Sequence, residues 1–128
     1  MNTLTFLPVL LLAIPPIVPQ AHPADRARTA AAIRQVLMAC IGHAQENKGA
    51  WPDDLASLRG LPPEAADLVY IKPIHPNKSA DTQVAVHEAY RQPPQQLNVG
   101  FVDGHVELLF FDQFQKLLEA SKARNQSK

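Results

Sequence analysis

The clearest pattern of hydrophobic and polar positions along the chain is an alternation on both sides of the dipeptide Asp103-Gly104. From Leu97 to Phe110, apolar side chains recur at every second position of each arm, a period typical of β-strands. Asp-Gly readily takes positive φ at both central positions of a type I′ turn, whose twist suits a two-residue hairpin. This stretch therefore predicts a β-hairpin with Asp103 and Gly104 at its turn.

A second pattern, with apolar residues at steps of three and four, predicts a long amphipathic helix. The helix is expected to begin at Ala24 or Asp25 and to end near Asn47, where Gly49 supplies a left-handed C-cap. Its apolar positions are Ala30, Ile33, Val36, Leu37, Cys40, Ile41 and Ala44. No cluster of cations lies near Cys40 in the sequence, so we expect a small buried hydrophobic residue rather than a reactive thiol.

Two short helices are predicted after the long one. The first is expected to start at Pro52 and Asp53, because proline is favoured at the first helical position. The second follows Gly60 and is expected to end near Asp67. Between these pieces Trp51 is expected to serve as a packing anchor.

Two more segments of the chain have β-strand character. These strands are predicted at residues 68–74 and 82–90. Pro73 cannot donate to a ladder, so the first of them is expected either to lie at a sheet edge or to end early. In the second strand, alternation predicts Val84 and Val86 on one face and Ala85 and His87 on the other.

The order of the predicted elements indicates an α+β fold. A terminal helix is predicted over residues 112–124, with Asp112 as its N-cap. Helices followed by a run of antiparallel strands favour a long N-terminal helix packed on one face of a small meander. The 128 residues suit a single domain, which we place at residues 25–124.

The N-terminal segment carries an apolar run at residues 4–18, interrupted by three prolines. A membrane-spanning helix needs about 20 apolar residues, so this run is short for a span. We expect residues 1–21 to be a signal peptide cleaved after Ala21, with a short membrane anchor as the alternative. Either role implies export, to the periplasm, the cell surface or the medium.

Composition excludes several classes of protein. Lys and Arg together number 12, as do Asp and Glu, so the formal net charge is zero. This balance argues against a nucleic-acid partner, which would require a basic excess. A single cysteine permits no internal disulfide and fits no zinc framework.

Two local patterns resemble a known family. A long predicted helix closes at Gly49-Ala50-Trp51-Pro52 and is followed by a short leucine-bearing segment. This arrangement resembles type IV pilins and type II secretion pseudopilins, in which a long helix ends at a Gly-aromatic-Pro turn. The stretch from Asn98 to Glu107 is similar to the C-terminal Asp-Gly hairpin of prepilin-like proteins of planctomycete-type bacteria.

The resemblance implies a pilin-like globular domain whose partners are pilin-like or secretion-system subunits. Its site residues would be structural, namely the turn residues Gly49, Pro52, Asp103 and Gly104. In the prepilin-like proteins a histidine precedes the Asp-Gly pair at a fixed spacing. In this chain the corresponding position is Pro93, so that histidine is absent. It also carries no basic leader and no prepilin peptidase motif before the helix, so we expect the globular domain without assembly through the usual helix.

The residues that could support chemistry are His87, Glu88, Asp103, His105 and Glu107. Consecutive strands could bring His87 and His105 together, and Asp103 or Glu107 could then complete a divalent metal site. Against a metal site, Asp103 is already explained by the turn. His105 and Glu107 share one face of a strand, as expected for a solvated surface.

Other chemical motifs are missing from the sequence. There is no glycine-rich phosphate loop, no Gly-x-Ser-x-Gly elbow and no His-Glu-x-x-His motif. The loop at 75–81 offers only Asp81 as a carboxylate, too few for calcium. We therefore predict a non-catalytic, exported, pilin- or pseudopilin-like structural or interaction protein with no cofactor. The alternative is a small exported metal-binding protein or enzyme that uses His87 and His105.

Overall fold

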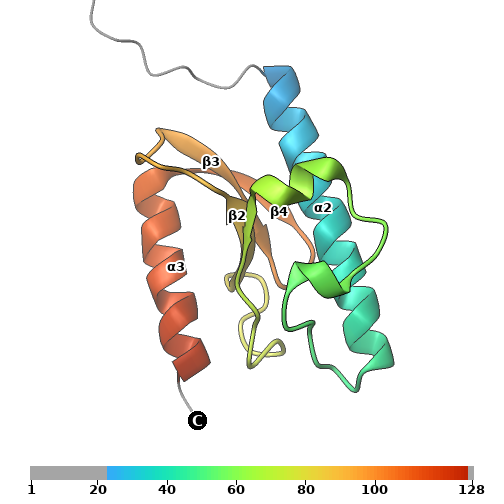
Figure 1. Cartoon of the computed structure of the whole chain (residues 1–128). Helices are drawn as coiled ribbons and strands as arrows, with labels where there is room; N and C mark the ends of the chain where they lie inside the picture. Colours follow the sequence, from blue (N-terminus) through green and yellow to red (C-terminus); the bar gives the residue numbers. More distant parts are fainter. Residues whose placement is uncertain (1–22, 127–128) are drawn as a thin grey trace, which may run out of the picture.

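The computed structural model describes residues 23–126, which form a long helix, a four-stranded antiparallel sheet and a C-terminal helix (Figure 1). The α-helices are α2 (Pro23–Glu46) and α3 (Phe111–Gln126), and the short 3-10 helices are η2 (Leu55–Ser57) and η3 (Pro63–Asp67). The strands are β1 (Leu68–Tyr70), β2 (Val84–Glu88), β3 (Gln96–Phe101) and β4 (Val106–Phe110). The predicted α+β class is confirmed. The predicted signal or anchor at residues 1–21 lies outside the described residues.

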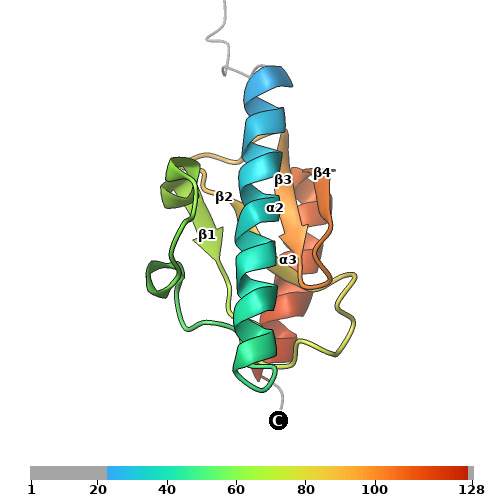
Figure 2. The ribbon, with the colours of Figure 1, turned by 90° about the vertical axis from the view of Figure 1, so that its right-hand side faces the viewer.

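The sheet is a meander in which each strand pairs antiparallel with the next one, in the order β1-β2-β3-β4. Figures 1 and 2 show α2 on one face of the sheet and α3 on the other. Each face has its own core cluster, with Leu37 and Val86 under α2 and Phe101 and Phe114 under α3. The predicted packing of the long helix on one face is confirmed, and α3 adds a third layer.

The apolar stripe predicted for the long helix is the face that α2 buries. Ile33, Val36, Leu37 and Cys40 are completely inaccessible to solvent. These side chains pack against the central strands, and β3 passes directly below them at Gly100. The burial of this stripe therefore holds α2 on the sheet.

Strand β2 contains an irregularity that changes which face its side chains occupy. The register shifts between Val84 and Val86, so Val84 packs with Phe114 under α3 while Val86 packs under α2. The prediction that these two valines share a face is wrong, because a β-bulge interrupts the alternation. At the bulge the Val84 N–H donates to Ser121 Oγ (2.9 Å), and Ser121 in turn donates to the Leu117 carbonyl (2.7 Å). Ser121 thus joins α3 to the bulge.

The strand predicted at residues 68–74 ends early, which is one of the two outcomes expected from Pro73. Strand β1 ends at Tyr70, although the Ile71 N–H still donates to the Ala85 carbonyl (2.7 Å). Its position at an edge of the sheet agrees with the prediction from Pro73.

The ends of two helices also differ from the prediction. The first short helix begins at Leu55 rather than at Pro52 and Asp53, because the Asp54 carboxylate accepts the Ser57 N–H (3.0 Å) and caps it. Helix α3 starts at Phe111, so Asp112 lies in its first turn rather than at the N-cap. An acidic residue in the first turn still favours the helix through the macrodipole.

Candidate functional site

The hairpin between β3 and β4 has a longer turn than predicted. The Gly104 N–H donates to the Phe101 carbonyl (2.9 Å), and the Phe101 N–H donates to the His105 carbonyl (2.9 Å). Gly104 has φ 99°, whereas Asp103 is not among the described residues with positive φ. The hairpin itself is confirmed, but the two-residue type I′ turn is wrong. The loop has three residues, and Gly104 is the left-handed fourth residue of the turn that begins at Phe101.

The Asp103 carboxylate supports this turn and also forms a hydrogen bond with the side chain of His105. Its carboxylate accepts the His105 N–H (3.1 Å) and contacts His105 Nδ1 (2.5 Å). On the other side of the ring, His105 Nε2 lies 2.9 Å from a Glu107 carboxylate oxygen. The imidazole stacks on Phe101 with ring centroids 4.4 Å apart. Both ring nitrogens can donate to carboxylates only when the ring is a protonated imidazolium.

The electrostatics of this network favour the charged forms. Partial burial alone would lower the pKa of His105, but its hydrogen bonds to Glu107 and Asp103 and their charges raise the pKa above 6.5. Burial alone would raise the pKa of Asp103, but its hydrogen bonds with His105 lower it below 3.8. The side chains of His105 and Glu107 are 38% and 51% exposed, as predicted for a solvated face. When protonated, His105 donates to both carboxylates of its own hairpin, and the network stabilises a surface turn.

His87 is the second histidine of the predicted metal site, and it is buried. Its ring packs edge-on against Phe114 with centroids 4.7 Å apart, and Nδ1 lies 2.7 Å from the Glu88 carbonyl. Burial lowers the pKa of His87, because the imidazolium would lose its hydration there. His87 is therefore a neutral core residue whose Nδ1–H donates to the backbone.

The structure does not bring the two histidines together on neighbouring strands. His87 pairs with Val99 of β3, and Val99 pairs with Glu107 of β4, so β3 separates β2 from β4. The expectation of a shared site on consecutive strands is wrong, because His105 directly precedes β4, which is not the neighbour of β2. Within residues 23–126, no group of three His, Cys, Asp or Glu side chains could hold a metal ion.

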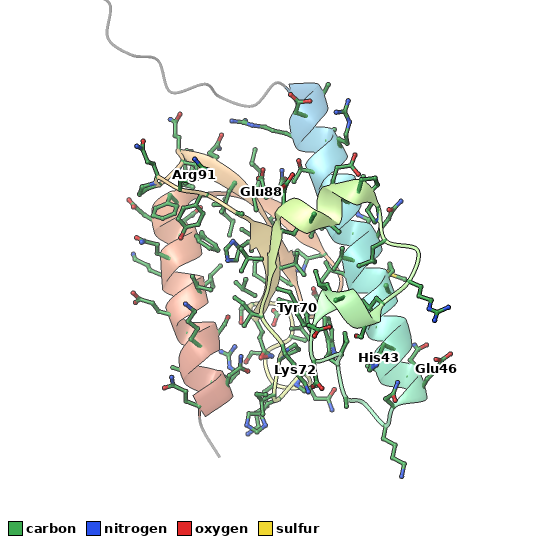
Figure 3. All side chains as sticks on the ribbon, viewed as in Figure 1. His43, Glu46, Tyr70, Lys72, Glu88 and Arg91 are labelled. Carbon is green, nitrogen blue, oxygen red and sulfur yellow. The ribbon has the colours of Figure 1, made fainter. Side chains whose placement is uncertain are left out.

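The corner after α2 contains the other two predicted turn residues, Gly49 and Pro52. Lys48 (φ 61°) and Gly49 (φ 87°) are both left-handed, and the Gly49 N–H donates to the Ala44 carbonyl (2.7 Å). This bond closes the helix with Lys48, rather than the predicted Gly49, at the first left-handed position after the cap. The buried Pro52 presents its carbonyl to the Tyr70 hydroxyl, which donates to it at 2.6 Å. Figure 3 shows Tyr70 and Lys72 beside this segment, and Lys72 Nζ lies 2.5 Å from Asp53 Oδ1. Gly49 and Pro52 therefore both help to fix the corner after α2.

Trp51 and Cys40 have the structural roles that the sequence predicts. Trp51 is 4% exposed and packs in the cluster under α2, together with the leucines of the following short segment. Cys40 is buried in the same cluster, and burial raises the pKa of its thiol to about 12. At neutral pH a thiol of this kind stays protonated and is a poor nucleophile.

Sequence reasoning missed the outer edge of β4. Because Phe101 and His105 form a hydrogen-bonded pair, the alternation of an antiparallel ladder turns the backbone groups of Val106, Leu108 and Phe110 away from β3. No strand lies beyond β4 among the described residues. Leu108 and Phe110 are 42% and 53% exposed, so apolar side chains line this open edge. The sequence shows the apolar alternation of this strand, but it does not show whether another element covers the edge.

A second surface lies on the solvent side of α2. Met38 is 60% exposed, the largest value among the exposed large hydrophobic residues of the described chain. It lies in a shallow groove of about 560 Å³ between α2 and the loop before η3, with Arg34 and Arg59 at its sides. This surface combines apolar and basic groups.

Comparisons with protein-family models, with curated proteins and with solved structures found no match for this chain. Within the described residues, no helix is long and apolar enough to cross a membrane. The geometry of the chain itself is therefore the basis for a functional proposal.

Proposed function

We propose that this chain is a non-catalytic, exported structural or interaction protein with a pilin-like fold, which works in a secretion or surface apparatus. The observation that carries the proposal is the placement of its exposed apolar groups. Leu108 and Phe110 line an open sheet edge, and Met38 lies on the outer face of α2. Exposed apolar groups on regular elements suit docking of other proteins.

The side chains with chemical potential support the same proposal. His105 is held between two carboxylates of its own hairpin, and His87 is packed in the core. Cys40 is buried and keeps its proton. Each of these groups has a structural partner, which suits a protein that acts through its surface. The zero net charge favours protein partners over nucleic acid.

The pilin-like assignment rests on the sequence resemblance and on the architecture. A long helix closed by Gly49, a turn fixed through Pro52, and an Asp-Gly hairpin on an antiparallel meander are the features that the resemblance predicts. The apolar run at residues 4–18 supports export, as a cleaved signal or as an anchor that contacts the membrane. The partners would be pilin-like or secretion-system subunits.

In-cell crosslinking tests this function. A photoreactive amino acid at Phe110 or Met38 should capture a protein of the cell envelope, whereas the same group at exposed Lys116 of α3 should not. Capture of cytosolic proteins only, or equal capture from all three positions, would contradict a docking role for these two surfaces.

A metal titration tests the alternative of a histidine site. Thermal melts with zinc or nickel should show no rise in Tm relative to a sample with chelator, because His87 and His105 are engaged separately. A rise in Tm that disappears in the His105→Ala variant would contradict the non-catalytic proposal.

A further inference from the structure

The two edges of the sheet are protected to very different degrees. Strand β1 has three residues and is followed closely by Pro73, a combination that limits pairing. Strand β4 has five residues and no proline, and Figure 2 shows it at the opposite margin of the sheet. Its only charged residue is Glu107. An edge of this kind is a ready template for another strand.

We propose that the β4 edge binds a second copy of this chain, with the two β4 strands antiparallel about a twofold axis at Leu108. This inference deepens the proposed function by naming one docking partner, and it rests on that function only in treating β4 as a docking edge. The two four-stranded sheets would then form one continuous eight-stranded sheet. An isologous contact of this type closes on itself and gives a dimer.

The alternation of β4 makes the strand complementary to itself. In the register centred on Leu108, this residue lies opposite Leu108 of the second copy, and Val106 lies opposite Phe110. All three residues turn their backbone groups outward, so each opposed pair can exchange two N–H···O bonds. Their side chains lie on the same face of the strand, so each pair also brings apolar groups together.

Glu107 selects this register over its nearest alternative. A twofold axis at Glu107 would place two carboxylates directly opposite each other, which disfavours pairing. With the axis at Leu108, Glu107 faces Leu109 of the second copy instead. The net charge of zero on each chain leaves no overall repulsion between copies. Charge and hydrophobic pattern thus favour the same pairing.

The size of the edge predicts a reversible dimer. Five strand residues and two exposed side chains form a contact well below the roughly 1,600 Å² of a standard stable interface. We therefore expect a monomer–dimer equilibrium that depends on protein concentration.

Analytical ultracentrifugation across a concentration series tests the self-association. The chain should shift from monomer to dimer, and Leu108→Lys should raise the dissociation constant by at least about tenfold, because two lysines would then meet at the axis. Met38→Lys is the matched control, since Met38 is more exposed than Leu108 but lies on α2. A monomer at every concentration, or an equal effect of both substitutions, would overturn the proposal.

Disulfide trapping tests the register. Directly opposed residues in a hydrogen-bonded pair lie about 5.5 Å apart at Cα, within the range of a disulfide. Leu108→Cys should therefore crosslink with itself, whereas Val106→Cys and Phe110→Cys should crosslink only when the two variants are mixed. The native Cys40 is buried and does not compete. Equal crosslinking by Met38→Cys, or self-crosslinking by Val106→Cys alone, would overturn the register.

These outcomes separate the two proposals. An exported chain that captures envelope proteins but stays monomeric in solution would overturn self-pairing and leave the proposed function in place. In that case the edge would serve an extended segment of a different protein.

Discussion

Gly100 of β3 lies so close to Ile33 of α2 that any side chain at position 100 would force neighbouring atoms to shift. A Cβ on Gly100 would lie 2.5 Å from Ile33 Cγ2 and 2.9 Å from Leu37 Cδ1. The missing side chain lets the helix approach the centre of the sheet, and the core under α2 forms around this contact.

Gly100→Ala should therefore destabilise the protein, because the added methyl group forces apart two elements of the core. We expect the free energy of unfolding to fall by about 1–3 kcal/mol in a denaturant melt, the usual effect of overpacking. In an Ile33→Ala background, which removes Cγ2, the same change should be less costly. An unchanged cost in that background would show that the contact is not the cause.

Gly104→Val should be far more damaging than His105→Ala. Valine at φ 99° is strained, and its Cβ would lie 3.4 Å from Ile41 Cδ1, so a loss of about 2–3 kcal/mol is expected. His105 is partly exposed, so its removal should cost less than about 1 kcal/mol. Urea melts of the two variants make the comparison, and similar losses would contradict the importance of the turn conformation.

Ser121→Ala should weaken the attachment of α3. It leaves the buried Val84 N–H without its acceptor, a loss of about 1–3 kcal/mol. Ser57→Ala is a suitable control, because the Ser57 hydroxyl donates to the Asp54 carbonyl at an exposed position. Loss of this hydroxyl should change stability by about 0.5 kcal/mol or less. Equal effects of the two substitutions in a thermal melt would contradict a specific role for Ser121.

The His105 network should stabilise the fold only within a limited pH range. The pKa of His105 is raised in the folded state, so its contribution is complete below pH 6.5 and is lost as pH rises through the raised pKa. The lowered pKa of Asp103 sets the acid limit, because that contribution is lost as pH falls through a value below 3.8.

His105→Gln should accordingly be less stable than the native chain near pH 5.5, by less than about 1 kcal/mol for such an exposed group. The difference between the two proteins should shrink as pH rises through the raised pKa of His105, because the native imidazole then loses its charge. Denaturant melts between pH 5 and 8 measure the difference, and a difference that grows with pH would contradict the assignment. Glu107→Gln should move the pKa of His105 toward 6.5 in an NMR titration.

Asp103-Gly104 shows how far the sequence predicts this fold. The pair located the hairpin correctly, because Gly104 is needed where φ is positive. Asp-Gly suits both a two-residue and a three-residue loop, and the sequence could not choose between them. In the structure Val102 belongs to the loop yet is only 6% exposed under α2, a tertiary contact that local patterns do not contain.

The faces of β2 and the open edge of β4 depend on residues that are distant in sequence. At the bulge, the Val84 N–H donates to the hydroxyl of Ser121, which lies 37 positions later in the chain. A period-two pattern within β2 could not reveal this partner. The alternation of Leu108 and Phe110 predicted a strand, but only the order of the sheet shows that no neighbour covers it within residues 23–126. The order of the sheet also explains why His87 and His105 do not share a site, since β3 lies between β2, which carries His87, and β4, which His105 precedes.

Export is the central claim of the proposed function, and one measurement tests it directly. The protein should be produced with its native N-terminus in bacteria, and its intact mass should be determined in the cytosolic, membrane, periplasmic and medium fractions. We expect either loss of about the first 21 residues with recovery outside the cytosol, or the full-length mass in the membrane fraction. Full-length protein confined to the soluble cytosolic fraction would contradict the account.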